Sequence, residues 1–254
     1  MTDESAGSAG SAGSAGRLAV LAANLSAVQA RIEAAAAAAG RDSGEVTLIA
    51  VTKTFPASDI ALLNQLGVTN IGENRDQEAA PKATACAAAG LAVRWHFVGQ
   101  LQVNKVASVA GYADMVHSVD RARLIPALGR RARAAGRVIE CLVQVSLDDA
   151  GDGGGAGTGR GGAAAAQVSE LAEALAAEEG LTLAGVMAVA PLGQPPRPAY
   201  VRLREIAEIV RSAHPAADVI SAGMSDDLEE AVAEGATHVR IGTALLGGRQ
   251  PFVR

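Results

Sequence analysis

The sequence is poor in aromatic residues, in cysteine and in lysine, and it has no excess of positive charge. Aromatic residues make up 2% of the 254 positions, too few for the stacking platforms that bind single-stranded nucleic acids. The formal net charge of −5 also lacks the basic excess typical of nucleic-acid-binding proteins. No run approaches the roughly 18 consecutive apolar residues of a membrane span. We therefore expect no nucleic-acid partner and no membrane partner.

The two cysteines, Cys86 and Cys141, are far apart and have no histidine cluster beside them. This spacing predicts neither a disulfide framework nor a metal site, and it fits a reducing cytoplasm. The N-terminal segment is acidic and rich in small residues, without the cationic and apolar regions of a signal peptide. A cytoplasmic location is the resulting prediction.

Two segments have low complexity. Residues 5–16 repeat the unit Ser-Ala-Gly, which buries too little apolar area to offset its ordering entropy, so we expect residues 1–16 to form a disordered tail. Residues 17–254 are then expected to form one domain. Within it, a glycine-rich surface loop is predicted at about residues 149–162, because its glycines lack the GK[ST] ending of a phosphate-binding loop.

Short apolar segments rich in β-branched residues alternate with helical segments along the rest of the chain. Eight such units predict an α/β fold, a single (β/α)₈ TIM barrel with an extra N-terminal helix at residues 18–39. An open doubly wound sheet stays possible, since a strand count from one sequence can err by one or two. Strands are expected at residues 45–53, 69–74, 93–99, 114–120, 138–147, 183–190, 217–224 and 237–246. Helices are expected at residues 58–66, 76–89, 121–135, 164–179, 199–213 and 226–234, with Ser58 and Ser225 as N-caps.

Lysine is scarce, with three lysines against nineteen arginines, and one of them, Lys53, lies where the first strand is expected to end. Active groups of such barrels lie at the C-terminal ends of the strands, and phosphate often binds after the last two. The seventh and eighth strands end in small and hydroxyl residues, including Ser225 and Thr243, which predict a phosphate cradle. A lysine facing a phosphorylated carbonyl compound suggests a Schiff base.

Structural roles remain open for the same residues when each is taken alone. Lys53 could pair with Glu73, and Arg240 could belong to a structural ion pair. His96 is interpreted as a hydrogen-bonded core residue. For His117, which lies near Asp120 in "HSVD", a strand-end hydrogen bond is favoured over an acid–base pair.

Several stretches, in this order, resemble the pyridoxal phosphate homeostasis proteins, which are single-domain relatives of the alanine racemase barrel. They are "LIAVTKTFP", "IGENRDQEAAPK", "WHFVGQLQVNK", "HSVD", "GVMAVAP" and "SAGMSDDLEEAVAEGATHVRIGTALLG". The resemblance spans residues 20–248 and implies the barrel of fold type III among proteins that use pyridoxal 5′-phosphate (PLP). Ala222 and Val103 depart from the residues common at those positions in the family.

The resemblance implies PLP as the cofactor, with an aldimine to Lys53, the phosphate held after the last two strands, and no metal. Asn74 would lie near the ring, and Arg240 would face the pyridine nitrogen. The implied cofactor-binding residues are Lys53, Asn74, Ser221, Met224, Ser225, Arg240, Gly242 and Thr243.

A role in intracellular PLP (vitamin B6) homeostasis without catalytic turnover is predicted. An arginine at the ring nitrogen leaves that nitrogen neutral and weakens the ring as an electron sink. The related racemases add a tyrosine base from a partner's second domain, whereas this chain has only Tyr112 and Tyr200. A monomer that meets PLP-dependent apoenzymes transiently is expected. The alternatives are a PLP-dependent amino-acid racemase of the alanine racemase type and a cofactor-free lysine aldolase acting on a phosphosugar.

Overall fold

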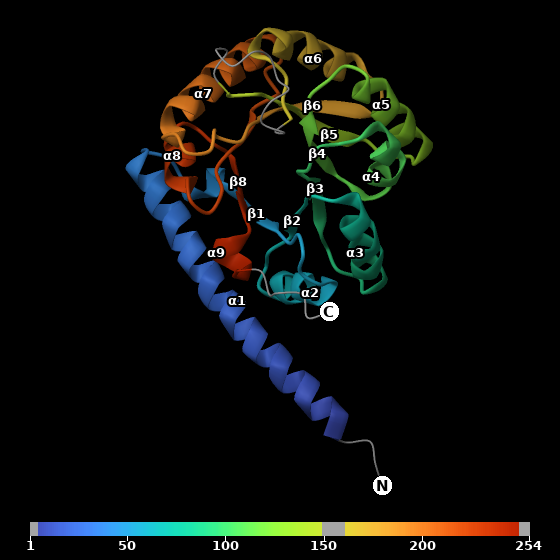
Figure 1. Cartoon of the computed structure of the whole chain (residues 1–254), viewed down its shortest axis with the longest axis vertical. Coiled ribbons are helices and arrows are strands. Elements are labelled where there is room, and N and C mark those ends of the chain that lie inside the picture. The colour runs from blue at the N-terminus through green and yellow to red at the C-terminus, as the bar shows by residue number, and fades with distance from the viewer. Residues whose placement is uncertain (1–4, 149–160, 249–254) are drawn as a thin grey trace.

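A closed barrel of eight parallel strands, in the order β1 to β8, forms the centre of the computed structural model (Figure 1). The structure describes residues 5–148 and 161–248. β1 closes the barrel by pairing with β8, where Ile49 lies opposite Arg240. This arrangement confirms the predicted (β/α)₈ barrel. The strands are β1 (Thr47–Val51), β2 (Asn70–Glu73), β3 (Arg94–Phe97), β4 (Met115–Val119), β5 (Ile139–Gln144), β6 (Leu181–Met187), β7 (Val219–Ser221) and β8 (His238–Ile241).

Helices surround the barrel as an outer ring, and α1 lies across the outside next to α8 and α9 (Figure 1). The helix α4 and the 3₁₀ turns η1 and η2 were not predicted. The elements are α1 (Ser5–Ala38), η1 (Ser43–Glu45), α2 (Ala57–Gln65), α3 (Asp76–Ala88), η2 (Val103–Lys105), α4 (Val106–Tyr112), α5 (Leu124–Ala134), α6 (Ala165–Ala177), α7 (Pro196–Ala213), α8 (Leu228–Ala233) and α9 (Thr243–Leu246).

The N-terminal helix is longer than predicted. It begins at Ser5 rather than at residue 18, so residues 5–16, expected in a disordered tail, are part of a helix in this structure; residues 1–4 lie outside the described part. Alanine has the highest helix propensity, and extending a formed helix costs less than nucleating one. The later turns of α1 provide the formed part, because Leu21 and Val28 are buried there against the barrel.

Several boundaries also differ from the expectations. β8 ends at Ile241, and residues 243–246, expected in the strand, form α9. Ser58 is not a cap, because α2 already begins at residue 57, after Pro56, whose extended backbone takes the N-cap position. Gly235 ends α8 with φ of +94°, as a glycine after a helix commonly does. Of the expected loop at about residues 149–162, residues 149–160 lie outside the described residues.

Alternation along the strands sorts side chains into two layers. Ala50, Ile71 and Val239 face the helices, where they pack in one cluster with the buried face of α1. Ile49 and Val51 face the barrel interior, and their methyl groups lie 2.9 Å and 3.2 Å from the position that a Cβ on Gly72 would take. The same alternation directs the next inward position beyond β1, residue 53, to the mouth at the C-terminal ends of the strands.

Candidate functional site

Lys53 follows β1 at the C-terminal mouth of the barrel, where its side chain is exposed. It makes no ion pair within residues 5–148 and 161–248. The alternative pairing with Glu73 is wrong, because Glu73 faces the helix layer and binds Lys82 at 2.7 Å. Alternation explains this result: Asn70 and Gly72 point inward from β2, so Glu73 points outward. The amine of Lys53 is therefore free to meet a ligand at the mouth.

Arg240 brings a cationic group into the barrel interior from β8. Its side chain is buried, and its guanidinium donates to Ser221 Oγ at 2.7 Å and to the carbonyl oxygen of Ala188 at 2.9 Å. The structural ion pair considered for it is absent from the described residues. Burial lowers the pKa of Arg240, but an arginine stays protonated in proteins. A buried positive charge with only neutral acceptors thus lies inside the barrel.

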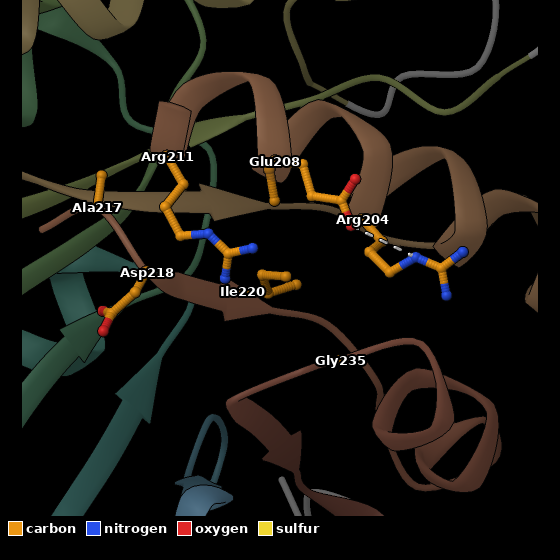
Figure 2. Close-up of a pocket in the computed structure, with 8 residues that line it drawn as sticks. Arg204, Glu208, Arg211, Ala217, Asp218, Ile220 and Gly235 are labelled. Atoms are coloured by element: carbon orange, nitrogen blue, oxygen red, sulfur yellow. Dashed lines mark ion pairs between the residues drawn. The ribbon is translucent and has the colours of Figure 1, made fainter. Parts of the chain in front are cut away.

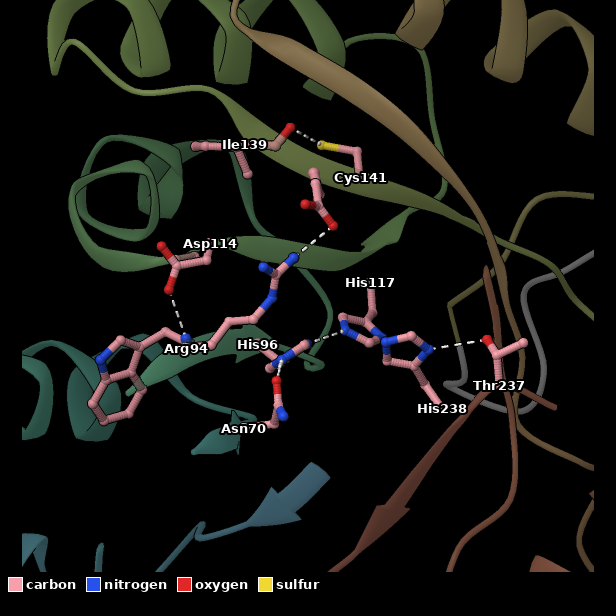
Figure 3. A network of polar contacts seen from close by, with 12 residues as sticks. Asn70, Arg94, His96, Asp114, His117, Ile139, Cys141, Thr237 and His238 are labelled. Atoms are coloured by element: carbon pink, nitrogen blue, oxygen red, sulfur yellow. Dashed lines mark hydrogen bonds and ion pairs between the residues drawn. The ribbon is translucent and has the colours of Figure 1, made fainter. Parts of the chain in front are cut away.

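A chain of hydrogen bonds continues from Arg240 across the interior, and Figure 3 shows its histidine part. Ser221 Oγ lies 2.9 Å from His117 Nδ1, and His117 Nε2 lies 3.0 Å from His96 Nδ1. His96 Nε2 lies 3.0 Å from the side-chain oxygen of Asn70. One arrangement of protons satisfies all of these contacts: each group donates toward Asn70, beginning with the guanidinium, and both imidazoles are neutral.

Burial keeps the interior histidines neutral. It lowers the pKa of His96 to about 3, that of His238 to about 4, and that of His117 well below its usual range. His238 adds to the shifts of both other imidazoles. The interpretation of His96 as a hydrogen-bonded core residue is confirmed. His117 bonds to Ser221 and His96, while the neighbouring Asp120 pairs with Arg121, so these two do not form an acid–base pair.

The turns after β7 and β8 lie together at the mouth. Ser225 Oγ accepts a hydrogen bond from the backbone N–H of Ala244 at 3.2 Å, which ties one turn to the start of α9. Met224 and Thr243 are exposed beside this contact, and Gly242 is partly exposed. Ser225 is not the cap of α8, because Asp227 holds the N-cap position and its carboxylate accepts the Met224 N–H at 2.6 Å. The Ser225 hydroxyl hydrogen is left available to a ligand.

Asn74, the first residue after β2, is held near the mouth by close packing against the turn after β3. A Cβ on Gly99 would stand 2.0 Å from the Asn74 carbonyl oxygen, so no larger residue fits. We expect Gly99→Ala to lower the free energy of unfolding by about 2 kcal/mol through overpacking, as measured by urea denaturation. Gly111→Ala is the matched control, since a Cβ there meets nothing within 4 Å and alanine favours the helix. Equal stability of the two variants would contradict the packing argument.

The structure thus brings most of the predicted residues to one end of the barrel: Lys53, Asn74, Met224, Ser225, Gly242 and Thr243 flank the mouth, while Ser221 and Arg240 lie deeper inside. Sequence reasoning missed Asn70 and His238, which begin β2 and β8. It considered the ends of strands only. Arg240 faces the barrel interior, and His238, two residues before it in the same strand, therefore faces the interior too. Within the described residues no group of three or more His, Cys, Asp or Glu side chains could hold a metal.

A separate small cavity of about 140 Å³ lies outside the barrel, between α7 and β7 (Figure 2). Arg204, Glu208, Arg211 and Asp218 are its charged lining. Arg204 is already paired with Glu208 at 4.0 Å and with the buried Glu234. None of the predicted site residues reaches this cavity, so the mouth of the barrel remains the candidate site. No helix in the described ranges is long and apolar enough to cross a membrane.

Known proteins are similar to this chain in sequence and in fold. The chain matches the family model of the alanine racemase N-terminal domain over residues 23–250. It is 44% identical over 240 residues to the pyridoxal phosphate homeostasis protein of Mycobacterium tuberculosis H37Rv, covering 89% of this chain and 92% of that protein. For the pyridoxal phosphate homeostasis protein of Escherichia coli K12, the values are 38% over 237 residues, 90% and 97%.

Solved structures agree with the sequence matches. The structure of PipY from Synechococcus elongatus with PLP bound has a TM-score of 0.76 and 30% identity, and the match covers 89% of this chain and all (100%) of that one. An alanine racemase of Clostridium difficile has a TM-score of 0.67 at 13% identity, with 92% of this chain and 57% of that chain covered. At that identity the racemase shows the fold alone.

Proposed function

Because the chain belongs to the pyridoxal phosphate homeostasis proteins, within the family of the alanine racemase N-terminal domain, we propose that it binds PLP covalently through Lys53. Its role is PLP homeostasis inside the cell, without turnover of a substrate. The observation that carries this proposal is the exposed amine of Lys53 at the mouth of the barrel whose interior holds the buried guanidinium of Arg240.

The donor set inside the barrel fits PLP. Arg240 binds only neutral acceptors, Ser221 Oγ and the Ala188 carbonyl, so its positive charge disfavours a second cation beside it. An unprotonated pyridine nitrogen can accept from a guanidinium, whereas a pyridinium cannot. Arg240 is therefore suited to face the ring nitrogen of the neutral pyridine, with Ser221 fixing the guanidinium. Asn74, at the end of β2, is assigned to the ring's edge.

The phosphate is assigned to the paired turns after β7 and β8. Ser225 and Thr243 supply hydroxyl groups there, Gly242 supplies partly exposed backbone, and Met224 is exposed beside them. The bond from Ala244 N–H to Ser225 Oγ fixes the distance between the turns. This is the position at which (β/α)₈ barrels commonly hold a phosphate. An anchored phosphate raises the effective concentration of the aldehyde at the Lys53 amine.

The covalent step explains why residue 53 is a lysine in an arginine-rich chain. The unprotonated amine of Lys53 adds to the aldehyde carbon, and loss of one water molecule leaves a carbon–nitrogen double bond, a Schiff base. Arginine cannot do this at neutral pH, because its guanidinium stays protonated. Since Lys53 is exposed, an amine of a PLP-dependent apoenzyme can approach the Schiff base and take the place of the Lys53 amine. Exposure therefore supports uptake and release of the cofactor.

The absence of turnover rests on the tyrosines. Both tyrosines of the sequence lie within the described residues, and neither reaches the mouth as a base. Tyr112 packs edge-on against Trp95 at 6.2 Å in the outer layer, and the Tyr200 hydroxyl donates to Asp227 at 2.6 Å. Burial raises the pKa of both. The cofactor then supplies aldehyde chemistry for storage and transfer, and no tyrosine stands ready to remove a substrate proton.

The test is the visible absorption spectrum of the purified protein, before and after borohydride, followed by peptide mass mapping. We expect an absorption band that borohydride abolishes and the corresponding added mass on the Lys53 peptide. Incubation with D- or L-alanine should give no steady racemisation, and steady racemisation would favour the racemase. A colourless protein that cannot be reconstituted with PLP would refute the proposal and leave the aldolase to be tested.

A further inference from the structure

The backbone on both sides of Lys53 is held by charged side chains of β2 and α3. On the N-terminal side, the Thr52 hydroxyl donates to Glu73 Oε1 at 2.6 Å, and Lys82 Nζ donates to the Thr52 carbonyl at 2.9 Å. Lys82 Nζ also lies 2.7 Å from Glu73 Oε1. The hydroxyl and the carbonyl of Thr52 are therefore both bound by one buried ion pair, whose carboxylate side chain is 0% and whose lysine side chain is 11% exposed.

On the C-terminal side, Thr54 adopts a backbone conformation that its side chain disfavours. Its φ of +69° makes it the one non-glycine residue with positive φ among the residues that the structure describes. For a β-branched residue such an angle is a true outlier, which persists only when the surroundings enforce it. The Thr54 N–H donates to Glu78 Oε2 at 2.8 Å. A turn hydrogen bond from the Phe55 N–H to the Thr52 carbonyl, at 3.0 Å, closes the same turn. Glu78 is thus the side-chain contact that holds the strained residue in place.

These contacts converge on Lys53, although none of the three acting side chains belongs to the cofactor-binding set. Glu73 faces the helix layer, and Glu78 and Lys82 lie on α3. Lys82 is one of the three lysines of the chain, and its compact ammonium group reaches two acceptors at once. Burial raises the pKa of Glu73, and the bonds from Lys82 and Thr52 oppose that rise.

We infer that Glu73, Lys82 and Glu78 form a backbone clamp that aims the Lys53 amine at the aldehyde of the bound cofactor. They are positioning residues, because they act through Thr52 and Thr54 and do not touch the ligand. The inference rests on the proposed function. A misdirected amine reacts slowly even where the binding site is intact, since reactivity of held groups falls steeply with misalignment.

Glu78→Ala tests the clamp, because Glu78 is partly exposed, at 29% of its side chain, and its loss leaves the core intact. We expect adduct formation with PLP, followed by stopped-flow absorbance, to slow about tenfold, with the final adduct still on Lys53. Hydrogen exchange of the Thr54 amide should accelerate. Glu78→Gln should restore most of the rate, since its amide oxygen can still accept from Thr54 N–H.

Glu45→Ala is the matched control, because Glu45 is an acidic residue in the first turn of η1, paired with Arg41 at the opposite end of β1. Its adduct rate should equal that of the wild type. If Glu78→Ala accelerates Thr54 exchange but forms adduct at the wild-type rate, or if Glu45→Ala slows the reaction equally, the clamp is refuted. A wild-type protein that forms no adduct instead defeats the proposed function itself, and the two failures are thereby distinguished.

Discussion

Replacing Lys53 by alanine is expected to abolish completely the PLP adduct that borohydride reduces, without unfolding the barrel. The loss is total because only a primary amine at this position can form the carbon–nitrogen bond. Lys53 is exposed and makes no ion pair within the described residues, so its removal should change stability by no more than about 0.5 kcal/mol. The thermal midpoint should therefore stay within about 2 °C of the wild type. Mass spectrometry after borohydride treatment measures the adduct.

Lys53→Arg sharpens the same test, because it keeps the positive charge and removes the reactive amine. It should behave like the alanine variant in the adduct assay and like the wild type in thermal unfolding. Lys105→Ala serves as the control for losing a different lysine, since Lys105 pairs with Asp76 at 3.7 Å. An undiminished adduct in Lys53→Ala, on any other lysine peptide, would show that the anchor has been assigned to the wrong residue.

Strand ends were readable from the sequence because barrel strands are short apolar segments with polar residues after them. That pattern places Lys53 and Asn74 near one mouth, since the C-terminal ends of parallel strands share one edge of the barrel. It could not place Glu73 correctly, because strand position alone does not say which layer a side chain faces. The alternation of side chains along β2 decides which layer Glu73 faces, and applying that alternation requires the register of the strand in the barrel.

Other features depended on contacts between segments far apart in the chain. The Glu78–Thr54 bond requires α3 to dock beside the end of β1, and nothing local to "TKTFP" indicates a positive φ at a threonine. The bond between Ser225 and Ala244 likewise joins two turns whose approach is set by barrel closure. The composition of the Ser-Ala-Gly repeat, taken alone, also does not indicate the helix that it extends.

Acidification should destabilise the folded protein steeply, because three of its four histidines lie neutral inside the barrel. The lowered pKa values, about 3 for His96 and about 4 for His238, mean that the unfolded chain binds protons that the folded chain does not. This contribution to stability is therefore complete above the unfolded pKa near 6.5 and is lost as pH falls below it. Each histidine should remove about 1.4 kcal/mol per pH unit between the unfolded and folded values.

His238→Gln tests one imidazole of this set, whose Nδ1 lies 3.0 Å from Thr237 Oγ1 and whose ring lies beside the His96 ring. Urea denaturation from pH 7 to pH 4.5 should show a pH slope of the unfolding free energy that is smaller than the wild-type slope by about 1.4 kcal/mol per unit. His214→Gln is the control for losing an imidazole outside the barrel. His214 follows the end of α7, where it lies beside Glu173. Buried carboxylates add their own slope, but they are common to all three proteins. An unchanged slope in His238→Gln would mean that His238 takes up a proton in the folded protein as readily as in the unfolded chain, which would contradict its burial as a neutral imidazole.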